Sequence, residues 1–245
     1  MAGAIREVCA LCGVFFALLG LTACGQAASS SDRLSDAEVV RIGRHSITKA
    51  TLDHWTAVEV VLTYQYPAAP KGLVPDPPDY AGCIAYSAVT AQAKHARPKP
   101  TKTQLKAACK QRYDAVRNHM LDILITNYWV SDEAASKGLK VTAKEVQQAL
   151  NRQFPTQAKL HKFLSITGER SSDQRSIIEH KLLLEKLQWS VSPLRGHVGP
   201  ESEQMVNRVD LSIAKLSEEM KRKWTPRTNC RAGYVVSECR QYRAP

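Results

Sequence analysis

The sequence predicts a mainly α-helical protein that is closed by a small two-stranded sheet, in which the N- and C-terminal segments pair. Apolar residues recur three or four positions apart over several long stretches, and capping residues precede many of these stretches, as is typical of amphipathic helices. Two short β-prone runs lie near opposite ends of the chain, and a lone strand could not satisfy its backbone hydrogen bonds. We therefore expect residues 37–189 to form a helical domain, which residues 190–245 complete with a closing helix and a strand.

The first elements of this domain are a β-prone run at residues 39–43 and a helix that Thr48 caps. The apolar stripe of this helix consists of Leu52, Trp55, Val58 and Val61. Residues 64–101 then contain seven of the twelve prolines of the chain. Because proline lacks a backbone donor and fixes φ, we expect this segment to be an extended loop and not a helix.

Four helices are predicted between the proline-rich loop and Trp189. The longest covers residues 102–137, where apolar residues keep helical spacing, and Gly138 follows as a residue type that commonly ends helices. Residues 142–150 begin with the Thr-x-x-Glu pattern of a capping box and form a short helix. The remaining two helices are expected at residues 155–168 and 171–189.

The C-terminal part of the chain is predicted to close the domain. Prolines and a glycine interrupt the helical pattern between Trp189 and Pro200, and a last amphipathic helix covers residues 201–224. The β-prone residues 233–238 follow. We expect them to pair with residues 39–43, because both segments need a partner for their backbone groups.

Residues 1–23 have the pattern of a signal peptide. Arg6 precedes an uncharged run at residues 8–21, which is too short to span a bilayer of about 30 Å as a helix. The run ends in Leu-Thr-Ala-Cys, the bacterial lipobox, so we expect cleavage before Cys24 and attachment of a diacylglyceryl lipid with chains such as palmitate to its thiol. Residues 24–36 are small and polar and are expected to be a flexible tether. These features place the protein on the extracytoplasmic face of the cell membrane.

Four cysteines remain for the folded part, and disulfides are favoured over metal ligation on an oxidising face of the membrane. They are Cys83, Cys109, Cys230 and Cys239. Three pairings are possible, and we favour Cys83–Cys109 and Cys230–Cys239 because each pair is local and flanks a loop or turn. Zinc is disfavoured, since neither a CxxC spacing nor a nearby HxxxH accompanies these residues. We expect no metal and no cofactor.

Composition and charge exclude several classes of protein. With 44% apolar and 23% charged residues, the chain is neither a fully disordered protein nor a multi-span membrane protein. The sequence contains no HExxH, GxSxG, P-loop or GxGxxG pattern.

The formal net charge is +11, and the densest basic stretch, residues 94–110, lacks interleaved aromatic residues, which disfavours nucleic acid as a partner. Attraction to anionic lipid next to the anchor is the simpler interpretation, and attraction to acidic clients is the alternative.

The order of these elements resembles the N-terminal chaperone domain of the SurA and PrsA extracytoplasmic foldases. The resemblance is carried by VVRIGRHSITKATLDHW at residues 39–55, GLKVT at residues 138–142, the block from Phe154 to Gly168, and the terminal stretch from Trp224 to Val236. The family's opening pattern has an Asn and a Glu that are absent here, where Arg41–Ile42 and Thr51 stand. The chain is most similar to the lipoprotein members of high-GC Gram-positive bacteria. The resemblance covers most of the mature chain.

Typical full-length members insert a parvulin prolyl isomerase domain before the closing helix, and here only residues 190–200 separate the two helices. A domain of on the order of 100 residues does not fit in that interval. The resemblance therefore implies an ATP-independent holdase or foldase that binds unfolded exported polypeptides in an apolar groove, without isomerase activity. The alternatives are a residual peptidyl-prolyl cis-trans isomerase and a non-catalytic envelope scaffold lipoprotein with one fixed partner.

Aromatic residues near helix edges and in the proline-rich loop are the candidates for contact with clients, because aromatic and methionine side chains adapt to varied apolar partners. The candidate client-binding residues are Tyr64, Tyr66, Tyr80, Trp129 and Trp189. Trp55 and Tyr128 are also near helix edges, but a position in the core is favoured for both. No catalytic residue is expected.

Overall fold

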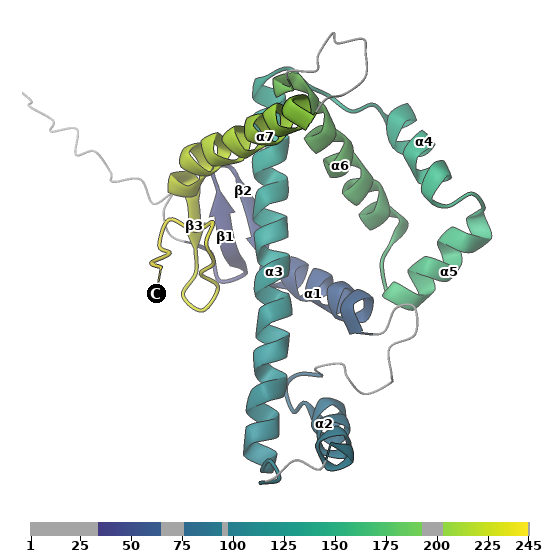
Figure 1. Ribbon diagram of the computed structural model, residues 1–245, viewed down its shortest axis with the longest axis vertical. Coiled ribbons are helices and arrows are strands. Elements are labelled where there is room, and N and C mark those ends of the chain that lie inside the picture. Colours follow the sequence, from purple (N-terminus) through teal and green to yellow (C-terminus); the bar gives the residue numbers. More distant parts are fainter. Residues whose placement is uncertain (1–33, 65–75, 95–97, 193–202, 245) are drawn as a thin grey trace, which may run out of the picture. The chain divides into compact units, whose positions relative to one another are not determined.

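The longest helix, α3 (Lys102–Ser136), runs through the computed structural model, and four other helices and the sheet contact it. The structure describes residues 34–64, 76–94, 98–192 and 203–244 (Figure 1). All of them belong to one unit, Leu34–Pro245. The described part of the chain is mainly helical and carries a small antiparallel sheet of its N- and C-terminal segments, which confirms the predicted fold class.

The sheet has three strands in the order β2-β1-β3, one more than predicted. β1 (Glu38–Ile42) pairs with β2 (His45–Thr48) through a tight turn, which Gly43 permits with its φ of 54°. β1 also pairs antiparallel with β3 (Thr228–Cys230), so that Val40 lies opposite Cys230. The N- and C-terminal segments therefore pair as expected.

The predicted position of the C-terminal strand, residues 233–238, is wrong. These residues lie inside the loop closed by the Cys230–Cys239 disulfide, which turns at Gly233 with a φ of 85°. The loop folds back on β3, since the backbone NH of Arg240 donates to the carbonyl oxygen of Thr228 at 2.9 Å. The ring that this disulfide closes is too short for residues 233–238 to run extended beside β1. The strand is formed instead by Thr228–Cys230, where the ring begins.

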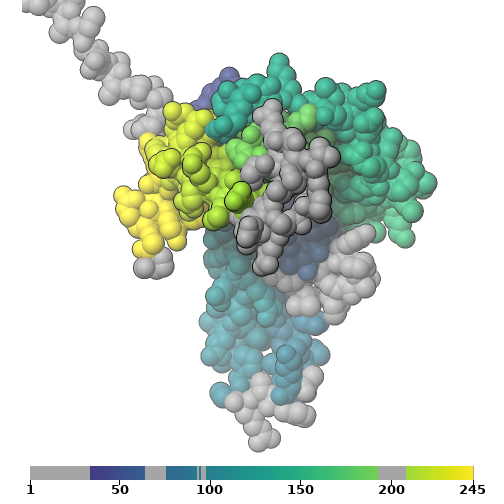
Figure 2. All heavy atoms as spheres, turned by 45° about the horizontal axis from the view of Figure 1, so that its top comes forward, coloured from purple at the N-terminus to yellow at the C-terminus, as the bar shows by residue number. Residues whose placement is uncertain are grey.

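The remaining predicted helices lie close to their expected positions, because their signals are local. α1 (Lys49–Tyr64) begins after Thr48, whose hydroxyl accepts the backbone NH of Thr51 at 3.1 Å. Capping threonines also precede α4 (Ala143–Gln153) and α5 (Gln157–Thr167). The last two helices are α6 (Ser171–Val191) and α7 (Glu203–Trp224), and α7 lies beside the C-terminal segment in Figures 1 and 2.

The expectation that residues 64–101 contain no helix is wrong, because α2 (Ala81–Ala93) lies within them. The prolines gather at the two ends of the segment, and the stretch from Asp79 to Arg97 is rich in alanine and free of proline. The Asp76 carboxylate accepts the backbone NH groups of Gly82 and Cys83 at 2.9 and 3.2 Å and so satisfies donors at the start of the helix.

Both favoured disulfides are present in the structure. Cys83–Cys109 joins α2 to the first part of α3, and Cys230–Cys239 closes the C-terminal loop next to β3. Cys83 and Cys109 form a small buried cluster with Tyr80, apart from the main core. The first disulfide therefore holds α2 on α3 at a site that has few other apolar contacts.

Two further clusters make up the apolar interior. The main core joins the sheet to α1, α3, α6 and α7, with Leu121, Ile125 and Leu187 fully buried at its centre. The second cluster holds α4 and α5 to α6 and consists of Val146, Leu150, Leu160 and Ile178. α6 belongs to both clusters, and its first half separates from α3 where the second cluster begins (Figure 1).

Candidate functional site: an apolar cavity between three helices

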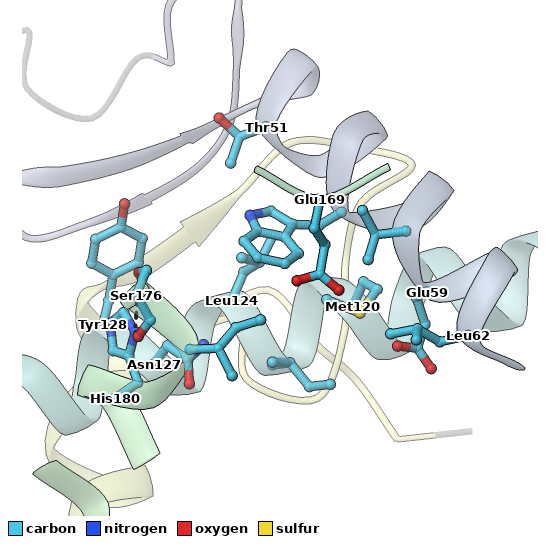
Figure 3. Close-up of a pocket in the computed structure, with 14 residues that line it drawn as sticks. Thr51, Glu59, Leu62, Met120, Leu124, Asn127, Tyr128, Glu169, Ser176 and His180 are labelled. Atoms are coloured by element: carbon cyan, nitrogen blue, oxygen red, sulfur yellow. Dashed lines mark hydrogen bonds between the residues drawn. The ribbon is translucent and has the colours of Figure 1, made fainter. Parts of the chain in front are cut away.

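A cavity of about 500 Å³ lies between α1, α3 and the first half of α6, with Glu169 from the α5–α6 junction at its edge (Figure 3). We call it the three-helix cavity. Apolar and aromatic side chains predominate in its lining. Its residues are Thr51, Trp55, Val58, Glu59, Leu62, Met120, Ile123, Leu124, Asn127, Tyr128, Glu169, Ser176, Ile177 and His180. Thr51 and Ile177 are exposed, so the cavity opens to solvent.

Helical spacing explains why these side chains share one space. Trp55, Val58 and Leu62 lie three and four positions apart on α1 and therefore face the same side. α1 contacts both α3 and α5, while α6 contacts α3 and α4. The second apolar cluster keeps α4 and α5 against α6, so neither α4 nor α5 fills the space between α1 and α6. The lining stays apolar because each helix presents its core-facing stripe to a gap.

Glu169 is the buried polar group of this cavity. Its position follows from Gly168, which ends α5 in the left-handed conformation with a φ of 76° and turns the chain inward. The side chain is only 6% exposed, and one carboxylate oxygen, Oε2, accepts a hydrogen bond from the Gln174 amide. The other oxygen, Oε1, has no hydrogen-bond partner among the described residues. Burial raises the pKa of Glu169, and the bond from Gln174 offsets part of that effect.

A second set of polar residues supports the same corner. The His54 Nε2 atom lies 2.9 Å from the Asp173 carboxylate, which also accepts hydrogen bonds from Arg170. Burial alone would raise the pKa of Asp173, but the hydrogen bonds from Arg170 and His54 outweigh it, and the net effect lowers the pKa. These contacts hold α1 to the start of α6. They explain how the corner that carries Glu169 is fixed in place.

Two acidic side chains line the three-helix cavity. Glu59 and Glu169 are its two carboxylates, and the fourteen described lining residues include no lysine or arginine. Glu59 accepts a hydrogen bond from the Thr63 hydroxyl at 2.8 Å and lies partly exposed. A cavity of negative character is therefore set into a chain of net charge +11.

A second cavity, also of about 500 Å³, lies at the other end of α6. It is lined by Leu139, Leu182, Glu185, Lys186, Trp189 and Ser190. Trp189 is 56% exposed there. This cavity has fewer apolar lining residues than the first, and Lys186 forms an ion pair with Glu145 at 2.6 Å.

The five candidate client-binding residues differ in exposure and do not gather at one site. Trp189 is exposed at the second cavity. Trp129 is buried in the main core and donates its indole NH to Thr228, and Tyr80 is buried beside the first disulfide, so neither reaches a surface where a client could bind. Tyr66 lies outside the described residues, and Tyr64 is the last residue of α1, with a side chain outside the description.

The sequence did not predict the three-helix cavity, and its lining residues were expected in other roles or were not singled out. Trp55 and Tyr128, for which a core position was favoured, pack half-buried against the main core and also line the cavity. Tyr128 stacks on His45 with ring centroids 4.9 Å apart, and Trp55 meets His54 edge-on at 5.4 Å. Glu169 gave no signal in the sequence other than its place directly after a helix-ending glycine. Nothing in a single sequence shows that three apolar stripes leave a gap between them.

Within the described ranges, no cluster of His, Cys, Asp or Glu could hold a metal ion, and no helix is long and apolar enough to cross a membrane. Cys24 and residues 1–23 lie outside the described residues. Comparisons with protein-family models, curated proteins and solved structures each give no match to this chain. The resemblance to SurA N-terminal domains therefore stays an expectation from the sequence pattern.

Proposed function

We propose that the protein is a lipid-anchored extracytoplasmic chaperone that binds apolar segments of unfolded exported polypeptides in the three-helix cavity, without ATP. The observation that carries this proposal is the cavity itself, a space of about 500 Å³ that opens to solvent and has a mostly apolar lining. Unfolded chains expose apolar segments that aggregate when they meet, and an apolar cavity that takes up such a segment keeps it apart from others.

The chemistry of the lining suits varied clients. Met120 contributes an unbranched, polarisable side chain, and Trp55 contributes a large flat surface. Side chains of this kind adapt to different apolar partners, as expected of a protein that binds many sequences with modest affinity. Two disulfides within the described residues also fit a protein that folds on the oxidising side of a membrane.

The test is the aggregation of a reduced model client in the presence of the purified protein. We expect suppression at equimolar amounts. Ile177 is 39% exposed at the cavity, so Ile177→Asp places a charge there at little cost in stability. The variant should need roughly tenfold more protein for the same effect, the factor that corresponds to about 1.4 kcal/mol.

Leu211→Asp is the matched control, because Leu211 is 70% exposed on α7 and does not line the cavity. It should suppress aggregation as the unmodified protein does. The proposal is wrong if the unmodified protein leaves aggregation unchanged at equimolar amounts. Capture of one stoichiometric partner, with no effect on the model client, would favour the scaffold instead.

A further inference from the structure

We infer that Glu169 makes the three-helix cavity selective for apolar peptide segments that carry a lysine or arginine side chain. The inference rests on the proposed function, because it names the kind of segment that the same cavity binds. The partner is defined by its chemistry: a cationic side chain with apolar residues on both sides of it in the sequence.

The first support is the unused hydrogen-bonding capacity of Glu169. Its Oε1 atom is buried and has no partner among the described residues, although Oε2 is bonded to Gln174. Figure 3 shows the carboxylate pointing across the cavity toward Met120. A buried acceptor without a donor is costly, and an ammonium or guanidinium group entering the cavity would supply the donor that is missing.

The second support is the charge at the cavity. Glu59 also lines it, and the described lining residues include no lysine or arginine; His180 is their one histidine. A lysine or arginine side chain would therefore meet attraction here, although the chain as a whole is basic. An acidic client segment would meet repulsion from both carboxylates in a partly desolvated space.

The third support is the apolar and aromatic part of the lining. Lysine and arginine have apolar stems that pack along hydrophobic surface while their charged ends reach a polar partner. Met120 and Leu124 offer that surface, and the Trp55 and Tyr128 rings are aromatic groups of the kind on which cations bind. One side chain of this type can thus satisfy the apolar and the acidic parts of the cavity together.

The test compares three labelled peptides that are identical except at one central position between apolar residues. The position carries lysine, acetyl-lysine or leucine, and binding to the purified protein is followed by fluorescence anisotropy. We expect the lysine peptide to bind about tenfold more tightly than the acetyl-lysine peptide, which keeps the stem and loses the charge. This comparison needs no variant of the protein.

The variant Glu169→Gln keeps the size of the side chain and removes its charge. It should abolish the preference for lysine, so that the lysine and acetyl-lysine peptides bind the variant with the same affinity. Glu179→Gln, on the exposed side of α6 and outside the cavity, is the matched control and should keep the preference. Far-ultraviolet circular dichroism and thermal unfolding verify that each variant is folded.

The outcomes separate this inference from the proposed function. Equal binding of the three peptides, or an unchanged preference in folded Glu169→Gln, would overturn the inference and leave the chaperone proposal standing. Binding of none of the peptides would contradict both. If sedimentation shows a dimer whose formation removes peptide binding, the occupant of the cavity is a second copy of the chain, and the inference is wrong.

Discussion

At the scale of single residues, two carboxyl groups far apart in the sequence share a hydrogen bond. Asp122 on α3 and Glu238 in the C-terminal disulfide loop are partners, and no donor among the described residues bonds to Asp122 Oδ1. Burial, the bond to Glu238 and the charge of Glu238 raise the pKa of Asp122 to about 8. Asp122 is therefore the member of the pair that keeps its proton near neutral pH.

This pair predicts how stability changes with pH. A carboxyl whose pKa is higher in the folded than in the unfolded state binds its proton more tightly when folded, so its contribution is complete below about pH 4 and is lost as pH rises toward 8. Asp122→Asn removes this loss. We compare the free energy of unfolding of the variant with that of the unmodified protein. With allowance for solvent screening of the partly buried pair, this difference should shift by roughly 2 kcal/mol in favour of the variant from pH 5 to pH 8.5.

Urea unfolding at pH 5 and pH 8.5 measures this difference. Asp210→Asn, an exposed position on α7, is the control and should change stability equally at both pH values. If Asp122→Asn shows no greater gain at pH 8.5 than this control does, the pair does not share a proton in the way described.

At the scale of elements, a buried chain of hydrogen bonds ties α3 to the end of α7 and to the sheet. The Trp129 indole NH donates to the Thr228 hydroxyl at 3.0 Å, and that hydroxyl donates to the carbonyl oxygen of Trp224 at 2.9 Å. Thr228 is fully buried at the start of β3. This one side chain therefore fixes where α7 ends and where β3 meets β1.

Thr228→Val keeps the shape of this side chain and removes both hydrogen bonds. We expect a loss of about 1–3 kcal/mol in the free energy of unfolding, because the Trp129 indole NH is left buried without an acceptor. Urea unfolding followed by tryptophan fluorescence gives the value. Thr126→Val, an exposed position on α3, should lie within about 0.5 kcal/mol of the unmodified protein. A similar loss in both variants would show that the buried bonds are not its cause.

The elements also show which features a single sequence predicts. The ends of α3, α4, α5 and α6 were predicted to within a few residues, because caps such as Thr142 and terminators such as Gly168 act within one turn of the helix. α2 was missed because the density of prolines was averaged over residues 64–101 instead of being located at the two ends of that segment. The strand at residues 228–230 was missed because the disulfide ring, and not β propensity, decides which residues run beside β1.

At the scale of the whole molecule, the site was less predictable than the fold. Periodicity shows which residues face inward on each helix, but the gap between α1, α3 and α6 depends on how far the second apolar cluster draws α6 away from α3. Trp55 and Trp129 illustrate the limit. Both are aromatic residues on helix stripes, yet Trp55 lines a cavity and Trp129 lies in the core. Only their packing partners, which are remote in sequence, distinguish them.

The proposed lipid anchor is also a property of the whole molecule. We expect Cys24→Ala to move the protein from the membrane fraction to the soluble fraction and to abolish its labelling by an alkyne fatty acid, because two acyl chains are needed for stable attachment. Cys9 lies in the expected signal peptide, so Cys9→Ala is the control and should change neither the membrane fraction nor the labelling. Labelling that persists in Cys24→Ala would place the lipid elsewhere or exclude it.

The pairing of β1 with β3 has a consequence for the order in which the chain assembles. β2 follows β1 directly in the chain, but the other edge of β1 waits for Thr228–Cys230, which are synthesised much later. Until then one row of backbone donors and acceptors stays open, a template on which other unpaired strands can add. A nascent copy of this protein thus has the same exposed edge that invites aggregation in its proposed clients, until β3 pairs with β1.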